Sequence, residues 1–355
     1  MKTLLAMLLC LSSCGALTPP AVDGGTVDAG TTQPVDAGDQ FDAGLSGTIE
    51  VTRLFTDRSR PGARAITGFR PWRGGIGIVG EWLYWVETGS APGLYRAPTM
   101  GCTAAACVEK LATMVRPSAF VATADSVLVS DVTALKRYLP DGGTQPIATA
   151  SAEVTNLTSD GASAFWTTES SPVVKTPFGG ASTTIINSNG TPVAMTVAGT
   201  RVYWAGVDIS GLLGAIQSIG TNGTGAREES RFGTGFEVMG GNATYLYYAK
   251  DSPAQVVRLT LSSGMLEVAA TNCQGVRDFA IDGTHAYWVE PGSGPDYANG
   301  RVRRVAHEST TPETLAQSIQ RPLGIALNGR VLFVASAGTS AASYADGAII
   351  RVTLP

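Results

Sequence analysis

The chain has 355 residues, a formal net charge of −4 and a charged fraction of 15%. Proteins that bind nucleic acid usually carry a basic face, so this balance disfavours nucleic acid as a partner. The 43 glycines, and the lack of any long stretch with helical apolar spacing, argue against a mainly helical fold. They predict an all-β chain of short strands joined by tight turns.

Residues 1–13 are predicted to form a signal peptide. A short positive start precedes the apolar run Leu4 to Leu11, which is too short to span a bilayer in the mature protein. The run leads into Leu-Ser-Ser-Cys at positions 11–14, and this segment resembles the lipobox of bacterial lipoproteins. The resemblance implies that Cys14 is lipidated and becomes the N-terminus. A plain secretory signal, with Cys14 incidental, is the alternative.

Residues 14–47 are predicted to form a lipidated, disordered tether. Asp-Ala-Gly triplets end at Gly30, Gly38 and Gly44, and such a sequence has too little apolar surface to bury a core. Several acyl chains on Cys14 would hold the protein stably on a membrane, with the tether as a spacer. Calcium binding by Asp residues is an alternative that lacks a compact ligand motif, so we expect no cofactor and no metal site.

Residues 48–355 repeat one phrase seven times: a turn, a few apolar residues and an aromatic pair, followed by a short basic strand. The copies end at Trp85, Val129, Trp166, Trp204, Tyr248, Trp288 and Val334. Their intervals of 37 to 46 residues fit one four-stranded propeller blade per copy. A strand of small residues precedes each copy and is predicted to be the innermost strand of its blade.

The last copy stops one strand short, and the segment Thr48 to Phe55 is left over at the other end of the repeats. Pairing the two would close the ring and hide two open strand edges. The sequence therefore predicts a seven-bladed β-propeller whose N-terminal strand completes the last blade. A six-bladed ring is the alternative, because the copies ending at Val129 and Val334 are weak.

The turn followed by apolar-Tyr-Trp resembles the YWTD and NHL propellers. The whole chain resembles bacterial lipoproteins with a signal peptide, an Asp-Ala-Gly tether and a repeat propeller. The resemblance implies the fold but no ligand site, because Trp85 is followed by Val-Glu and Trp204 by Ala-Gly in place of Thr-Asp. We expect the repeated Trp to pack between blades, where a large ring fills the wedge between twisted sheets.

The cysteines predict one disulfide. Cys102 and Cys107 flank a turn in the first blade and are close enough to bridge in an oxidising compartment. Cys273 is left single and is expected to be a buried or loop thiol. Because no further Cys or His stands at ligand spacing, a metal site at these cysteines is not expected.

Catalytic groups are sparse in this sequence. A nucleophile needs a nearby base, and the chain's two histidines, His285 and His307, are expected to be exposed turn residues at the end of the ring opposite the predicted site. Two carboxylates suffice for glycoside hydrolysis. A polysaccharide lyase or hydrolase that uses acids in the loops is therefore the alternative to a non-enzymatic binding function.

The predicted binding face gathers the loops after each aromatic phrase and the connections into each inner strand, which share one end of the ring. Charges of both signs with a few aromatic residues would suit a ligand or peptide site. The alternative is that these loop tips are polar only because they are exposed, as in any soluble propeller. The candidates are Arg70, Trp72, Glu87, Arg116, Asp131, Glu169, Asp208, Asp251, Arg277, Glu290, Tyr297, Arg321 and Tyr344.

The sequence thus predicts a monomeric lipoprotein of the bacterial cell envelope. The lipid on Cys14 would hold it on a membrane. Because Gly15 follows this residue in place of Asp, the outer membrane is favoured, on the periplasmic side or at the cell surface. The loop face would bind an unknown protein or glycan partner.

Overall fold

The computed structural model describes residues 50–55, 75–87, 91–101, 107–168, 172–186, 191–207, 214–232, 236–294, 297–338 and 347–355. The chain divides into two compact units, Met1–Gln40 and Phe41–Pro355, and every described residue belongs to the second. Within the described residues, no helix has the length and hydropathy needed to cross a membrane. The signal peptide, Cys14 and the tether lie outside the described residues and stay predictions.

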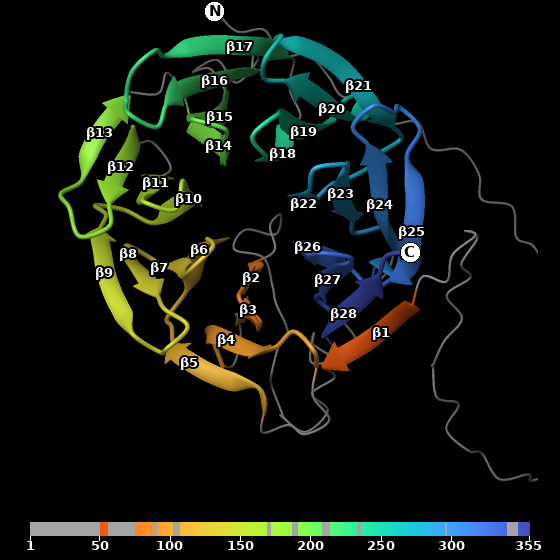
Figure 1. The fold of residues 1–355 in the computed structure, drawn as a ribbon, viewed down its shortest axis with the longest axis horizontal. Helices are drawn as coiled ribbons and strands as arrows, with labels where there is room; N and C mark the ends of the chain where they lie inside the picture. Colours follow the sequence, from red (N-terminus) through yellow and green to blue (C-terminus); the bar gives the residue numbers. More distant parts are fainter. Residues whose placement is uncertain are drawn as a thin grey trace, which may run out of the picture. The chain divides into compact units, whose positions relative to one another are not determined.

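Seven antiparallel four-stranded sheets are arranged in a ring, which confirms the seven-bladed propeller (Figure 1). The innermost strands are β2 (Ile76–Val79), β6 (Pro117–Ala122), β10 (Val154–Ser159), β14 (Thr191–Ala198), β18 (Phe236–Gly241), β22 (Asp278–Ile281) and β26 (Pro322–Asn328). The second strands are β3 (Trp82–Glu87), β7 (Val127–Asp131), β11 (Ser163–Thr168), β15 (Arg201–Val207), β19 (Tyr245–Asp251), β23 (His285–Glu290) and β27 (Val331–Ser336).

The third strands are β4 (Gly93–Pro98), β8 (Ala134–Tyr138), β12 (Val173–Pro177), β16 (Gly214–Gly220), β20 (Ala254–Thr260), β24 (Gly300–Ala306) and β28 (Ala348–Thr353). The outer strands are β5 (Glu109–Thr113), β9 (Thr144–Thr149), β13 (Thr183–Ile186), β17 (Arg227–Phe232), β21 (Met265–Thr271), β25 (Glu313–Ile319) and β1 (Glu50–Phe55). Blade 1 is β2–β5, the blades follow in chain order, and blade 7 combines β26, β27 and β28 with β1.

Blade 7 is closed by the first strand of the chain, as the sequence predicts. The strand β1 pairs antiparallel with β28, with Glu50 opposite Thr353 and Phe55 opposite Ile349. Inner strands of neighbouring blades contact one another all round the ring, and this includes β2 with β26. The ring is therefore continuous from blade 7 to blade 1.

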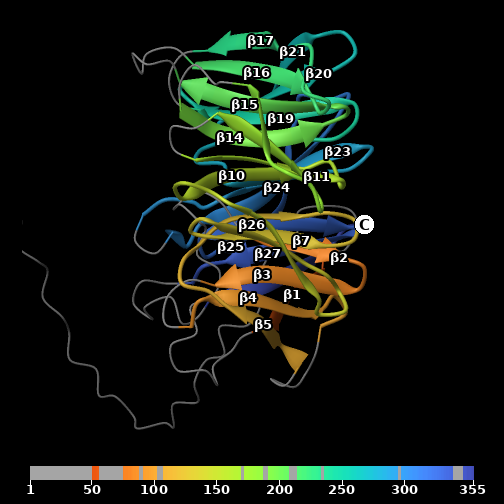
Figure 2. The same cartoon turned by 90° about the vertical axis from the view of Figure 1, so that its left-hand side faces the viewer.

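The two ends of the blades form two faces of the ring (Figure 2). We call one the mouth face: it carries the connections from each outer strand to the next inner strand and from each second strand to the third. The other, the turn face, carries the hairpins between first and second strands and between third and fourth strands. Because Glu50 is opposite Thr353, the last residue of β28, the chain begins β1 at the turn face.

The aromatic pair fills the spaces between blades. Successive side chains of a strand point to opposite sides of the sheet. The two residues of the pair therefore pack against the two blades on either side of their own. Trp85 is buried with Phe333 of blade 7, while Tyr84 is buried with Val129 of blade 2. Seven such clusters of buried residues each combine two neighbouring blades. The repeated Trp therefore has the packing role that the sequence predicts.

Small residues on the inner strands allow these strands to approach one another at the centre. A Cβ on Gly240 would lie 2.8 Å from the Cβ of Phe279, and one on Gly241 would lie 2.7 Å from the Cβ of Ala198. Both distances are shorter than van der Waals contact between carbon atoms. A larger residue at either position would therefore push two blades apart.

The basic residue of the third strand pairs with an acid on the outer strand in several blades. Arg96 contacts Glu109 at 2.8 Å in blade 1, and Arg304 contacts Glu313 at 2.8 Å in blade 6. Both are direct cross-strand neighbours in the sheet register. The short basic strand of the repeated phrase is thus part of the pairing between the two outermost strands of a blade.

His307 differs from its prediction as an exposed turn residue, because it is 4% exposed. Its Nε2 lies 3.1 Å from the carbonyl oxygen of Asp282, and its Nδ1 lies 2.8 Å from the hydroxyl of Tyr247. Since a carbonyl can only accept, Nε2 donates, and in the neutral ring Nδ1 accepts from Tyr247. The histidine links blades 5 and 6 beneath the turn face.

Candidate functional site

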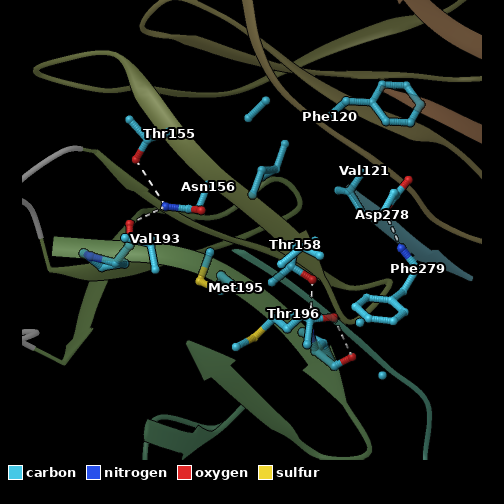
Figure 3. A pocket seen from close by; sticks show the side chains of 18 of the residues that line it. Phe120, Val121, Thr155, Asn156, Thr158, Val193, Met195, Thr196, Asp278 and Phe279 are labelled. Carbon is cyan, nitrogen blue, oxygen red and sulfur yellow. Dashed lines mark hydrogen bonds between the residues drawn. The ribbon is translucent and has the colours of Figure 1, made fainter. Parts of the chain in front are cut away.

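A cavity of about 650 Å³ lies among the inner strands β6, β10, β14, β18 and β22. One wall carries hydroxyl and amide groups, and Figure 3 shows Phe120 and Phe279 on the other side of the space from Thr155 and Asn156. Each inner strand is the edge strand of its blade, and its free edge faces the centre of the ring. The backbone N–H and C=O groups along this edge have no neighbouring strand of the same sheet to bond. The channel wall is therefore polar even where its side chains are not.

Asn156 is the best-defined polar side chain of this wall and is 3% exposed. Its Nδ2 donates to the carbonyl oxygen of Pro192 at 2.9 Å and to the hydroxyl of Thr167 at 3.0 Å. Because the carbonyl of Pro192 can only accept, the amide nitrogen must face it. All the hydrogen bonds that Asn156 makes within the described residues use Nδ2, so its Oδ1 remains an acceptor (Figure 3).

Thr158 lies two residues further along the same strand, on the same face of the sheet, and is 5% exposed. Its hydroxyl oxygen accepts a hydrogen bond from the backbone N–H of Val197 at 3.0 Å. This bond occupies an edge group of the next blade's inner strand and leaves the hydroxyl hydrogen of Thr158 able to donate. Blade 3 thus presents both a donor and an acceptor beside the cavity.

Three charged residues line the cavity, and all three lie at its mouth-face end. Asp251 ends β19 and is exposed, and Arg277 directly precedes β22. Asp278 accepts from the backbone N–H of Phe279 at 2.9 Å and of Ile325 at 3.0 Å, which fixes the start of β22 against blade 7. The structure therefore brings two predicted candidates, Asp251 and Arg277, to the wall of one cavity.

Tyr297 and Arg321, two further predicted candidates, meet on the mouth face between blades 6 and 7. The guanidinium carbon of Arg321 lies 5.2 Å from the centre of the Tyr297 ring. The backbone N–H of Arg321 also donates to the carbonyl oxygen of Tyr297 at 3.1 Å. Tyr297 remains 40% exposed, so the pair presents an aromatic ring and a cation together at the surface.

Arg116 and Asp131 lie on the mouth face of blade 2. The guanidinium of Arg116 is 2.6 Å from the carboxylate of Glu153, and both side chains are exposed. Asp131 accepts from the backbone N–H groups of Val115 and Arg116, at 3.0 Å and 2.7 Å. Asp131 therefore holds the connection into β6 in place, while Arg116 remains at the rim.

Glu87 and Glu290 are placed inside the wall between blades. Glu290 is 2% exposed and accepts from the indole N–H of Trp288 at 2.8 Å. Glu87 is 7% exposed and accepts from the indole N–H of Trp85 at 3.0 Å. Each acid follows its Trp by two residues, and side chains two apart in a strand share a face. That spacing was the available signal for this buried position.

The other candidates lie outside the described residues: Arg70, Trp72, Glu169, Asp208 and Tyr344. Cys102 also lies outside them, so its pairing with Cys107 stays a prediction. Cys273 is a free, fully buried thiol, and burial together with the nearby Glu290 raises its pKa to about 11. Within the part of the chain that the structure describes, no group of three His, Cys, Asp or Glu residues could hold a metal ion.

Backbone strain is concentrated at the mouth face. Five described residues other than glycine have positive φ, and they lie in its connections or at strand ends that lead into them: Val132, Asn272, Tyr297, Ser318 and Arg321. In the turn-face hairpins, by contrast, left-handed positions are filled by residues such as Gly161 and Gly199. A β-branched residue with φ of 58°, such as Val132, is unusual. Strain of this kind is often retained where a site requires it.

The sequence pattern did not single out the cavity residues Asn156 and Thr158. Both belong to the segment Val-Thr-Asn-Leu-Thr-Ser of β10, whereas the predicted inner strands are composed of small apolar residues. The cluster of polar residues in an innermost strand was the signal for this site.

No protein-family model and no curated protein matches the sequence. Among solved structures, a chain of the mitotic checkpoint complex is similar with a TM-score of 0.59 at 12% identity, over 96% of this chain and 100% of that chain. The computationally designed Ika8 protein is similar with a TM-score of 0.55 at 10% identity, over 85% of this chain and 99% of that chain.

The extracellular domain of a putative hybrid two-component system from B. thetaiotaomicron is similar with a TM-score of 0.59 at 8% identity. The match covers 86% of this chain and 40% of that chain. At these identities the likeness shows the propeller fold alone.

Proposed function

We propose that the chain is a non-enzymatic binding protein of the bacterial cell envelope that captures a protein or glycan partner on its mouth face. Lipidation of Cys14 would tether it, with the outer membrane favoured. The lipobox-like segment supports the anchor, and two similar solved structures that are extracellular domains of a bacterial protein are consistent with an exported location.

The contact between Tyr297 and Arg321 carries this proposal. Tyrosine and arginine are enriched among residues that dominate binding energy at interfaces, and here one of each is held in place by backbone conformations that cost energy. Both residues have positive φ, at 52° and 43°.

The test compares capture of envelope proteins and glycans by the full-length protein in detergent, using the variants Tyr297→Ala and Arg321→Ala. Each should weaken capture at least about tenfold, as expected for truncation of a central interface residue. Arg330→Ala is the matched control, because Arg330 is exposed on the turn face of the same blade. Equal capture by all three variants would refute the placement of the site.

The alternative of a lyase or hydrolase finds no support at Glu87, Asp131 and Glu290. The carboxylates of Glu87, Asp131 and Glu290 form hydrogen bonds that hold the fold. We therefore assign them structural roles and base no catalytic proposal on them.

A further inference from the structure

The central cavity offers a second place for a ligand, separate from the surface pair Tyr297 and Arg321. Its volume of about 650 Å³ falls within the range of roughly 300–1,000 Å³ that is typical of small-molecule sites. The five inner strands that frame it belong to blades 2 to 6. Any ligand held there would contact several blades at once.

Below the mouth, the lining that the structure describes is uncharged. The charged lining residues Asp251, Arg277 and Asp278 all lie at the mouth-face end, and Asp278 already accepts two backbone hydrogen bonds. Burying an ionised group without a partner is strongly unfavourable. The part of a ligand that enters the cavity should therefore carry no charge.

The same lining is polar on one side and aromatic on the other. Asn156 and Thr158 are both more than nine-tenths buried, and between them they retain an acceptor oxygen and a donor hydrogen beside the cavity. Phe120 and Phe279 line the other side (Figure 3). Buried polar groups normally have hydrogen-bond partners, so a suitable ligand has both donors and acceptors together with a weakly polar face.

We propose that this cavity binds the uncharged end of a glycan chain, up to a few sugar units long. Sugar hydroxyls both donate and accept without charge, and the C–H face of a sugar ring packs well on an aromatic side chain. The inference rests on the proposed binding function and names the ligand class. An acidic polysaccharide is disfavoured because no described cation lies below the mouth, and a peptide is an alternative outcome of the test.

The test measures binding of maltotriose, cellotriose and chitotriose to the full-length protein by calorimetry, with trigalacturonate and a neutral tripeptide as competitors. We expect at least one neutral trisaccharide to bind and neither competitor to displace it. Absence of binding by all three sugars at about 10 mM, which is far weaker than usual carbohydrate affinities, would overturn the inference. Tighter binding of the tripeptide or of trigalacturonate would overturn it as well.

Two variants locate the bound sugar. Val193→Phe replaces a lining side chain by a larger aromatic one, which narrows the cavity, and should weaken sugar binding at least about tenfold. Thr196→Val removes a lining hydroxyl while keeping the size of the side chain, and should weaken sugar binding about fivefold. The isosteric change keeps the test decisive even when Val193→Phe does not fold. Unchanged sugar affinity in Thr196→Val and in a folded Val193→Phe would refute the site.

The two proposals fail in different ways. The variant Tyr297→Ala should lose partner capture but keep trisaccharide affinity within about twofold, since the ring lies on the surface and not among the cavity residues. If Tyr297→Ala loses partner capture and the wild-type protein binds no trisaccharide, the mouth-face function is supported and the cavity site is refuted. If the wild-type protein binds a trisaccharide and Tyr297→Ala captures the partner normally, the cavity site is supported and the placement of the mouth-face site is refuted.

Discussion

Replacing Glu290 by Gln should destabilise the ring while leaving its architecture intact. Glu290 is 2% exposed and accepts from the indole of Trp288. It also lies 2.6 Å from the guanidinium of Arg301 and 3.2 Å from that of Arg303. Glutamine keeps an acceptor for the indole but removes the negative charge, so the buried guanidinium of Arg303 loses its partner.

The expected loss follows from the burial of the two arginines. Removing one partner of a buried ion pair costs about 3–5 kcal/mol. The side chain of Arg301 is 37% exposed and can recover hydration, whereas that of Arg303 is 11% exposed. We therefore expect the free energy of unfolding to fall by about 2–3 kcal/mol, at or just below the lower limit of that range, because solvent reaches Arg301.

Glu313→Gln is the matched control, since it makes the same chemical change in the same blade. Glu313 pairs with Arg304 at 2.8 Å, but its side chain is 45% exposed, so its loss should cost less than about 1 kcal/mol. Guanidinium unfolding followed by tryptophan fluorescence and by circular dichroism measures both variants. Equal stability of the two variants would show that the network around Glu290 is not a stabilising ion pair.

Three further predictions concern a buried tyrosine and the cysteines. Burial and the neighbouring Asp282 raise the pKa of Tyr287 to about 12. In the unfolded chain the same hydroxyl loses its proton near pH 10. The free energy of unfolding should therefore fall as the pH rises from about 10 to about 12. Tyr287→Phe should show a smaller loss over that interval in urea unfolding, and an identical pH profile would contradict the assignment. Cys273, whose pKa burial raises to about 11, should resist maleimide at pH 8 until the protein unfolds. Labelling of Cys102 and Cys107 without reductant, read by mass spectrometry, would disprove their predicted disulfide.

The number of blades and their closure followed from the sequence because both depend on local repetition. The repeated phrase recurs once per blade, and alternation along a strand places its last two side chains in two different spaces between blades. The weak copies at Val129 and Val334 still supply a buried aliphatic residue at the same position. The repeat spacing was therefore a better guide to the ring than the identity of any single residue.

The candidate site was less predictable, because side-chain roles depend on neighbours that are distant in the chain. His307 occupies a turn, but Tyr247 from the preceding blade covers it. Glu290 was predicted to lie in a loop, but it is the last residue of β23, and Arg303 of the next strand binds it inside the wall. Asn156 is held in the cavity wall by its hydrogen bond to the carbonyl oxygen of Pro192 in the next blade. The contacts of His307 and Asn156 join neighbouring blades, whereas that of Glu290 joins two strands of blade 6.

The pairing of β1 with β28 has a mechanical consequence for a tethered protein. Tension between a membrane anchor and a partner held at the mouth face would enter the ring through Glu50 and pass along the ladder from Glu50–Thr353 to Phe55–Ile349. The hydrogen bonds of this ladder run across the strands, so they would share the load in shear. The closing blade would then bear the force, and its failure would detach the tether before the other six blades were pulled apart.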